Sequence, residues 1–210
     1  MNYTAIKESA QAYTDRYDEE LVDSLPAFTR IVESKINMAL KVGDQSIRAQ
    51  IPLYSNKEYY PLPCDFGGMR DIEVLKNGDF VGGTTLIYLS PEEMNKVSRK
   101  KDGRPHNYYT IIGNQIQICG ATDDHILEIV YYQLVPPLQE PEDTNWLSEQ
   151  HPQAYVFGMA AEICAYAKDA VGFQTYDGRF KETLFEITQE DQVSRWSGPA
   201  LRVQLDALVV

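Results

Sequence analysis

Apolar residues recur with helical spacing near both ends of the 210-residue chain. A short amphipathic helix is expected at about residues 3–13. A second helix is expected after Ser24, because one apolar stripe follows at Leu25, Phe28, Val32, Ile36 and Ala39. Ser24 is predicted to cap this helix, with Pro26 in its first turn and Gly43 just past its end.

Two further helices are predicted after residue 150. The first begins near Pro152 and is apolar around most of its surface. The second carries a stripe made of Phe173, Tyr176, Phe180, Leu184 and Ile187. Because only residues 168–172 connect them, the two helices are expected to pack as an antiparallel pair.

Between these helical ends the apolar period changes to two, which is typical of strands. The alternation begins at Ser46, and a later strand is expected at residues 125–134. Asn77-Gly78 and Gly113-Asn114 each predict a hairpin turn. Ser90, followed by Pro91 and Glu93, predicts the start of a short helix between the two hairpins.

Together these patterns predict an α+β protein. The N- and C-terminal segments, residues 1–43 and 144–195, should form a helical domain built as a bundle or hairpin. Residues 46–138 should form a β-rich insert domain, and residues 196–210 an extended C-terminal arm. The proline-rich acidic segment VPPLQEPEDT is interpreted as the linker that leads back to helix.

The charge of the chain argues against general nucleic-acid binding. Thirty-one acids and nineteen bases give a formal net charge of -12, so the surface should on average repel phosphates. One local cluster is positively charged, and it consists of Arg99, Lys100, Lys101 and Arg104. It is a candidate contact for DNA or for an acidic partner; the alternative is a solvated loop tip.

Candidate catalytic and metal-binding patterns are missing. The three histidines have no metal-ligand spacing, and the glycine pairs fit turns or bulges better than phosphate loops. Cys64, Cys119 and Cys164 fit neither a disulfide framework nor a zinc site, so free thiols are expected. No catalytic, cofactor or metal residue is therefore proposed. We also expect no signal peptide and no membrane-spanning segment.

Doubled tyrosines occur at Tyr59-Tyr60, Tyr108-Tyr109 and Tyr131-Tyr132. On a strand, each pair places one ring on either face. Tyrosine offers apolar area with a polar tip and is favoured at interfaces. These pairs therefore indicate a sheet covered on both faces, either by helices of the same chain or by a neighbouring subunit.

The C-terminal arm is apolar and alternating. Leu201, Val203 and Leu205 alternate with polar residues, and Leu208, Val209 and Val210 follow. Pro199 cannot continue the preceding helix, and Gly198 lets the chain turn away. Such a segment either folds back onto its own core or docks on a partner.

The order of these segments resembles the head-to-tail adaptor family (tail tubular or connector proteins) of short-tailed bacteriophages. Four stretches carry the likeness, and they cover nearly the whole chain in order: LPAFTRIVESKINMALKV; YYPLPCDFGGMRDIEVL; YLSPEEMNKV with NYYTIIGNQIQI; and LEIVYYQLVPPL with TNWLSEQHPQAYVFGMAAEICAYAKD and RWSGPAL. One departure is Cys119-Gly120, where the family usually has a proline after the second hairpin.

The resemblance implies a structural virion protein without enzymatic activity or cofactor. It implies a dodecameric ring that joins the portal protein to the tail nozzle or tail tube protein and lines the channel for double-stranded DNA, without sequence specificity and without a membrane. Such a ring would be assembled in the host cytoplasm and lie at the head-to-tail interface of the virion. Because related connectors hook onto the portal by a terminal extension, docking is favoured for Leu201, Val203, Leu205, Leu208 and Val209. The alternatives are a small-molecule enzyme of unrecognised type and another oligomeric phage structural protein with the same fold.

Overall fold

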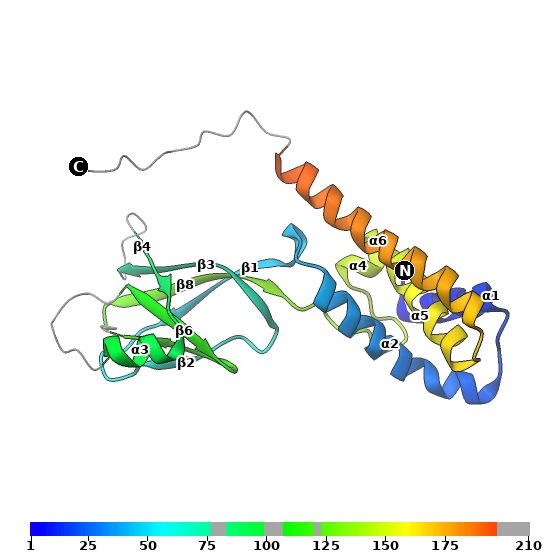
Figure 1. The fold of residues 1–210 in the computed structure, drawn as a ribbon, viewed down its shortest axis with the longest axis horizontal. Helices are drawn as coiled ribbons and strands as arrows, with labels where there is room; N and C mark the ends of the chain where they lie inside the picture. Colours follow the sequence, from blue (N-terminus) through cyan, green and yellow to red (C-terminus); the bar gives the residue numbers. More distant parts are fainter. Residues whose placement is uncertain (77–82, 99–106, 120–122, 197–210) are drawn as a thin grey trace. The chain divides into compact units, whose positions relative to one another are not determined.

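The computed structural model describes residues 1–76, 83–98, 107–119 and 123–196 of a mixed α+β protein (Figure 1). The chain divides into two compact units. The helical unit contains Met1–Gly43 and the described residues from Pro137 to Trp196, and the β unit contains the described residues within Asp44–Pro136. The β unit is therefore inserted between two parts of the helical unit.

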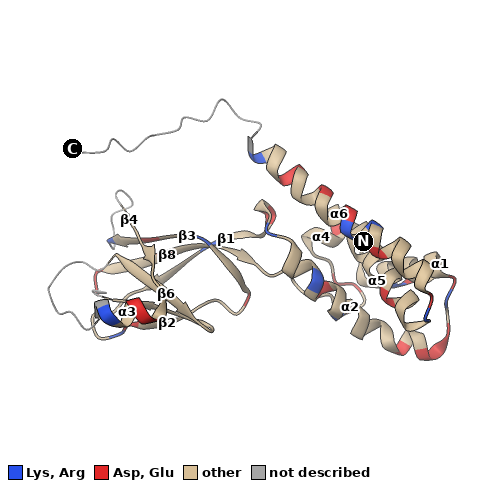
Figure 2. Ribbon diagram, in the orientation of Figure 1, with Lys and Arg blue, Asp and Glu red and all other residues tan. Residues whose placement is uncertain are grey.

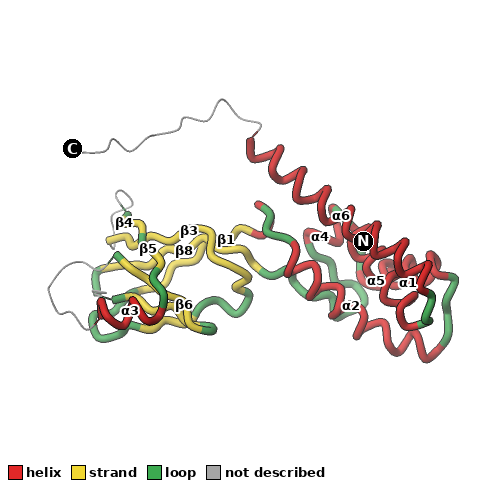
Figure 3. Tube along the Cα trace, viewed as in Figure 1, coloured by secondary structure: helices red, strands yellow, loops and turns green. Residues whose placement is uncertain are grey.

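The β unit contains two four-stranded sheets (Figure 3). The first has the order β1 (Ser46–Pro52), β8 (His125–Gln133), β3 (Phe66–Lys76), β4 (Thr84–Thr85). The second has the order β2 (Tyr59–Pro61), β7 (Gln115–Ile118), β6 (Tyr108–Ile112), β5 (Ile87–Tyr88). Paired strands are antiparallel except β5 and β6, which run parallel.

The core of the β unit is formed by alternate residues of its strands. On β8, Leu127, Ile129 and Tyr131 are buried, whereas the residues between them are partly exposed. This alternation is the pattern of a strand with one face toward a core. The same cluster includes residues of both sheets and of their connections: Leu53, Tyr60, Leu62, Ile72, Leu86, Ile116 and Ile118.

Turns and the short helix of the β unit follow the sequence signals. The predicted hairpin at Gly113-Asn114 is confirmed, since Ile112 pairs with Gln115 and Gly113 has a φ of +59°, a value that glycine adopts without steric cost. Ser90 accepts a hydrogen bond from the Glu93 backbone N–H (3.3 Å) at the start of α3 (Pro91–Ser98), as predicted. The predicted turn at Asn77-Gly78 lies outside the described residues.

The helical unit is arranged around α5 (Pro152–Tyr166), which contacts all four other helices. These are α1 (Tyr3–Thr14), α2 (Glu19–Ala39), α4 (Trp146–Gln150) and α6 (Ala170–Trp196). Because α5 has neighbours on several sides, most of its residues are buried, which explains its apolar sequence. Lys168 has a φ of 58°, and Asp169 then accepts hydrogen bonds from the N–H groups of Val171 and Gly172 at the start of α6.

Three helices of the helical unit approach one another closely at Gly158 of α5. A Cβ atom placed there would lie 2.7 Å from a methyl of Val32 on α2 and 3.1 Å from the ring of Phe180 on α6. Glycine therefore lets both neighbouring helices reach the α5 backbone at one point.

The predicted start of α2 is wrong. The helix begins at Glu19, so Ser24 lies inside it and donates a hydrogen bond to the Glu20 carbonyl (2.9 Å) instead of capping. Leu21 is buried and extends the apolar stripe toward the N-terminus, and Glu19 and Glu20 favour a helix start electrostatically. Pro26 accordingly lies within the helix, and Ala39, expected on the buried stripe, is exposed.

Helix α4 was not predicted. It has only five residues, too few to show helical periodicity. Its start is fixed by side chains, because Asn145 accepts from the Ser148 N–H (2.8 Å) while the Ser148 hydroxyl accepts from the Asn145 N–H (2.9 Å). This reciprocal capping box is a local signal that the sequence does contain.

The doubled tyrosines are not equally covered. Tyr60 is buried, and its hydroxyl donates to the Lys57 carbonyl (2.9 Å) and accepts from the Tyr54 N–H (2.8 Å). Its neighbour Tyr59 is 47% exposed. The described part of the chain therefore leaves the Tyr59 side of β2 exposed to solvent.

Candidate functional site

The candidate contact residues lie outside the described part of the chain. The basic cluster Arg99, Lys100, Lys101 and Arg104 follows directly after α3, and the arm residues Leu201, Val203, Leu205, Leu208 and Val209 follow α6.

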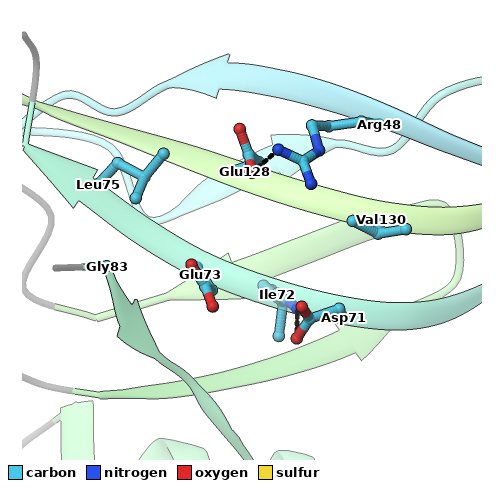
Figure 4. A pocket seen from close by; sticks show the side chains of 8 residues that line it. All are labelled: Arg48, Asp71, Ile72, Glu73, Leu75, Gly83, Glu128 and Val130. Atoms are coloured by element: carbon cyan, nitrogen blue, oxygen red, sulfur yellow. Dashed lines mark hydrogen bonds and ion pairs between the residues drawn. The ribbon is translucent and has the colours of Figure 1, made fainter. Parts of the chain in front are cut away.

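A cleft of about 310 Å³ lies on the first sheet of the β unit, on the face away from the core (Figure 4). Strands β1, β8 and β3 position its charged side chains. Glu128 forms an ion pair with Arg48 (3.0 Å) and accepts a hydrogen bond from Gln50 (2.8 Å). Glu73 stands opposite Glu128 in the strand register, with Gly83 against its carboxylate.

This cleft has the chemistry of a solvated acidic surface. Of its three carboxylates, Glu128 is matched by Arg48, which leaves Asp71 and Glu73 to give it a negative potential. Its lining residues contain no histidine, cysteine or hydroxyl group. Within residues 1–76, 83–98, 107–119 and 123–196, no cluster of histidine, cysteine and acidic side chains has the arrangement of a metal site.

Two tyrosines with raised pKa values belong to packing networks. Burial, together with a hydrogen bond to Asp65 (3.0 Å), raises the pKa of Tyr131 to about 12. Gln133 donates to the other oxygen of Asp65 (2.6 Å), so this carboxylate ties β8 to the start of β3. In the helical unit, burial raises the pKa of Tyr155, whose hydroxyl accepts from Asn145 (2.9 Å). These tyrosines therefore stay neutral and hold neighbouring segments together.

Glu33 is the one acid within the helical interior whose pKa is shifted among the described residues. It is 7% exposed and accepts a hydrogen bond from the Leu138 N–H (2.7 Å). Burial raises its pKa, while the Leu138 hydrogen bond and the Arg30 charge act in the opposite direction. The residue ties α2 to the segment that re-enters the helical unit after the β insert.

Two helix faces of the helical unit expose apolar side chains. The first, named the α2 face, consists of Ala27, Ile31, Ser34 and Met38, with Met38 73% exposed. The second, named the α6 face, consists of Val171, Gly178, Phe185 and Val193, with Phe185 64% and Val193 70% exposed. The exposed polar residues Thr175, Glu182 and Gln189 lie between them on the same side of the helix. Each face follows helical spacing on the side of its helix opposite the buried stripe.

Sequence reasoning missed both faces. The signal was present, because Ile31, Met38 and Phe185 are large apolar residues that fall between the predicted core positions. A single apolar residue off the core stripe is common on protein surfaces, however, and does not by itself indicate an interaction surface.

No helix within the described ranges combines the length and apolar character needed to cross a membrane. A family model described as SU10 adaptor protein matches residues 1–203 of the chain. The match therefore spans both the helical and the β unit. A search of curated proteins finds no match.

Proposed function

The chain belongs to the SU10 adaptor protein family, a family of phage head-to-tail adaptors, and on that premise we propose that it forms a dodecameric ring between portal and tail. The observation that carries the proposal is the match over residues 1–203, which covers the whole fold and not one module. In this role the protein is a structural part of the virion, with portal protein above it and tail nozzle or tail tube protein below it. The ring is assembled in the host cytoplasm.

A closed ring makes a physical demand that the helical unit meets. Cyclic assemblies larger than a dimer use two different faces, so that each copy binds its neighbour head to tail. The helical unit has two distinct helix faces, on α2 and on α6, that each expose large apolar side chains. We therefore assign the body of the ring to the helical segments, residues 1–43 and 144–195.

The charge of the chain suits a channel for DNA. With a net charge of -12 per copy, a ring whose acids face its lumen repels the phosphate backbone. Tight non-specific binding depends on lysine and arginine at phosphates. Double-stranded DNA would then pass without adhering and without sequence readout.

Two segments are proposed as partner contacts. The arm, residues 196–210, docks on the portal through Leu201, Val203, Leu205, Leu208 and Val209. Its alternating pattern suits strand addition, in which backbone hydrogen bonds bind and alternate side chains fill pockets. Arg99, Lys100, Lys101 and Arg104 contact either DNA or an acidic partner surface.

Electron microscopy of the purified chain mixed with its phage's portal protein tests the proposal. Rings of the chain seated on one end of the portal are expected. If the chain stays unbound at micromolar concentrations of both proteins, or binds as dimers, the adaptor role as proposed is wrong.

Truncation tests the arm. Removal of residues 200–210 should leave the melting temperature unchanged and abolish portal binding. A matched variant, in which Arg99, Lys100, Lys101 and Arg104 become serine, should also fold normally if the cluster contacts a partner and not the core, because substitutions outside a core cost little. Its expected defect is in tail assembly or DNA retention. If the truncated chain binds portal as well as the full chain does, the arm is not the docking segment.

A further inference from the structure

We propose that the α2 face of one copy packs against the α6 face of the next copy, with the two helices running parallel. The inference rests on the proposed ring and adds to it the two surfaces that join neighbouring subunits. It concerns contacts between copies of this chain.

The placement of the two helices gives the contact its direction. Both α2 and α6 pack on α5, and Val32 and Phe180 from their buried sides meet at Gly158. Figure 1 shows α6 and α2 along different sides of the helical unit, with α5 between them. Since each exposed face lies opposite the buried stripe of its own helix, the two faces point away from the unit in different directions.

The faces differ in shape in a way that suits a mutual contact. The α6 face carries the large ring of Phe185, and Gly178, which has no side chain, lies two turns before it. The α2 face carries small residues, Ala27 and Ser34, beside Ile31. A bulky side chain on one helix fits a gap between residues of the facing helix, which is the general form of close helix packing.

Charges beside the two faces select the parallel orientation. Arg30 borders the α2 face and Glu186 borders the α6 face, and both are exposed. About two helical turns earlier on each helix lie Asp23 and Arg179, again exposed and again opposite in sign. Figure 2 shows acidic and basic residues interspersed along α6.

A single parallel register satisfies both pairs. Setting Glu186 beside Arg30 also sets Arg179 beside Asp23, because each pair is displaced by the same distance along its helix. The same register places Phe185 at the level between Ala27 and Ile31, and Val193 at the level of Met38. In an antiparallel packing the two charged pairs fall on opposite edges of the contact.

Cross-linking between single-cysteine copies tests the contact. Cys64 is exposed and is first changed to serine, whereas Cys119 and Cys164 are buried and stay. In this background, Met38→Cys protein is mixed with Val193→Cys protein and treated with a short bis-maleimide, in the presence of portal. Tyr17→Cys, at a position 63% exposed and off both faces, replaces either partner as the matched control.

The Met38→Cys and Val193→Cys pair should cross-link about tenfold faster than either control pair, because a shared interface raises the local concentration to the millimolar range. Faster cross-linking within Met38→Cys alone or within Val193→Cys alone indicates a two-fold contact and overturns the proposal. Equal rates in all mixtures overturn it as well.

Charge reversal tests the register independently. Arg30→Glu and Glu186→Arg should each lower the cross-linking rate, and the two together should restore it. A double variant as slow as the single ones overturns the parallel pairing. Electron microscopy of the same samples distinguishes failure of this interface from failure of the adaptor role. Rings without the expected cross-link leave the adaptor role intact and reject this interface, whereas the absence of rings rejects both.

Discussion

Replacement of Gly158 by alanine probes the packing on which the helical unit depends. In an exposed helix this change stabilises, by up to about 1 kcal/mol, because alanine loses less backbone entropy than glycine on folding. Here the new methyl group would lie 2.7 Å from Val32 Cγ1 and 3.1 Å from the Phe180 ring. A neighbouring side chain or one of the helices must therefore shift.

The expected cost follows from what can move. Val32 is β-branched and has one preferred rotamer in a helix, so its methyl cannot swing away cheaply. Phe180 is buried on the other side. Overpacking of this kind costs about 1–3 kcal/mol. After subtraction of the alanine gain, Gly158→Ala should destabilise the helical unit by up to about 2 kcal/mol, which lowers the melting temperature by up to about 8 °C in a chain of this size.

Gly178 supplies the matched control. It lies within α6, and nothing stands within 4 Å of a Cβ atom built on it. Gly178→Ala should raise the melting temperature by about 1–4 °C, since only the helix-propensity gain applies. Thermal and urea unfolding followed by circular dichroism at the helix band measure both variants under identical conditions.

A double-mutant cycle locates the clash. In a Val32→Ala background, Gly158→Ala has room and should become neutral or stabilising. The reasoning is refuted if Gly158→Ala stabilises the unmodified chain as Gly178→Ala does. It is equally refuted if the cost persists in full when Val32 is alanine, because the cost then comes from another contact.

Three further outcomes are expected. Burial raises the pKa of Glu33 above its ordinary 4.5, so the contribution of this residue to the free energy of unfolding is full below the ordinary pKa and is lost as pH rises through the raised pKa. Glu33→Gln should therefore flatten the dependence of the free energy of unfolding on pH in that range, measured by urea unfolding at a series of pH values. An unchanged pH dependence would contradict the assignment. A thiol reagent should modify Cys64 rapidly in the native protein but Cys119 and Cys164 only in denaturant. Burial also raises the pKa of the Cys164 thiol, which further slows the reaction of this residue with the reagent. Rapid modification of all three thiols without denaturant would disprove this. Tyr60→Phe should destabilise the β unit by about 1–2 kcal/mol, since the hydroxyl bonds of Tyr60 to the 54–57 loop are lost, and tryptic cleavage at Lys57 should quicken, whereas the exposed Tyr59→Phe should change neither.

Local signals in the sequence were sufficient where a few adjacent residues decide the structure. Gly113 at a tight turn, Ser90 at the start of α3 and Pro152 at the start of α5 each act through neighbouring backbone groups. The sequence also determined the mixed α+β class, because helical and strand periods separate cleanly along the chain. Family membership could also be predicted from the sequence, because the segments that resemble the family occur in the same order.

Local reasoning failed where a distant contact changed the local choice. Ser24 is a good cap residue, yet α2 continues through it because Leu21, one turn earlier, is buried in the helical unit. The intrinsic preference of a residue for a cap is worth about 1 kcal/mol. Burying a leucine side chain is worth about 2–3 kcal/mol, so the packing term prevails.

Only the tertiary structure decided which apolar residues remain exposed to solvent. Ile31, Met38, Phe185 and Val193 are as apolar in the sequence as the core residues beside them. Their exposure depends on where α5 lies, since α2 and α6 each turn one side toward it and the opposite side away. Periodicity gives the angular position of a residue on its own helix. Which angle meets a neighbour is set by the packing of the other helices, and that information is spread over segments far apart in the chain.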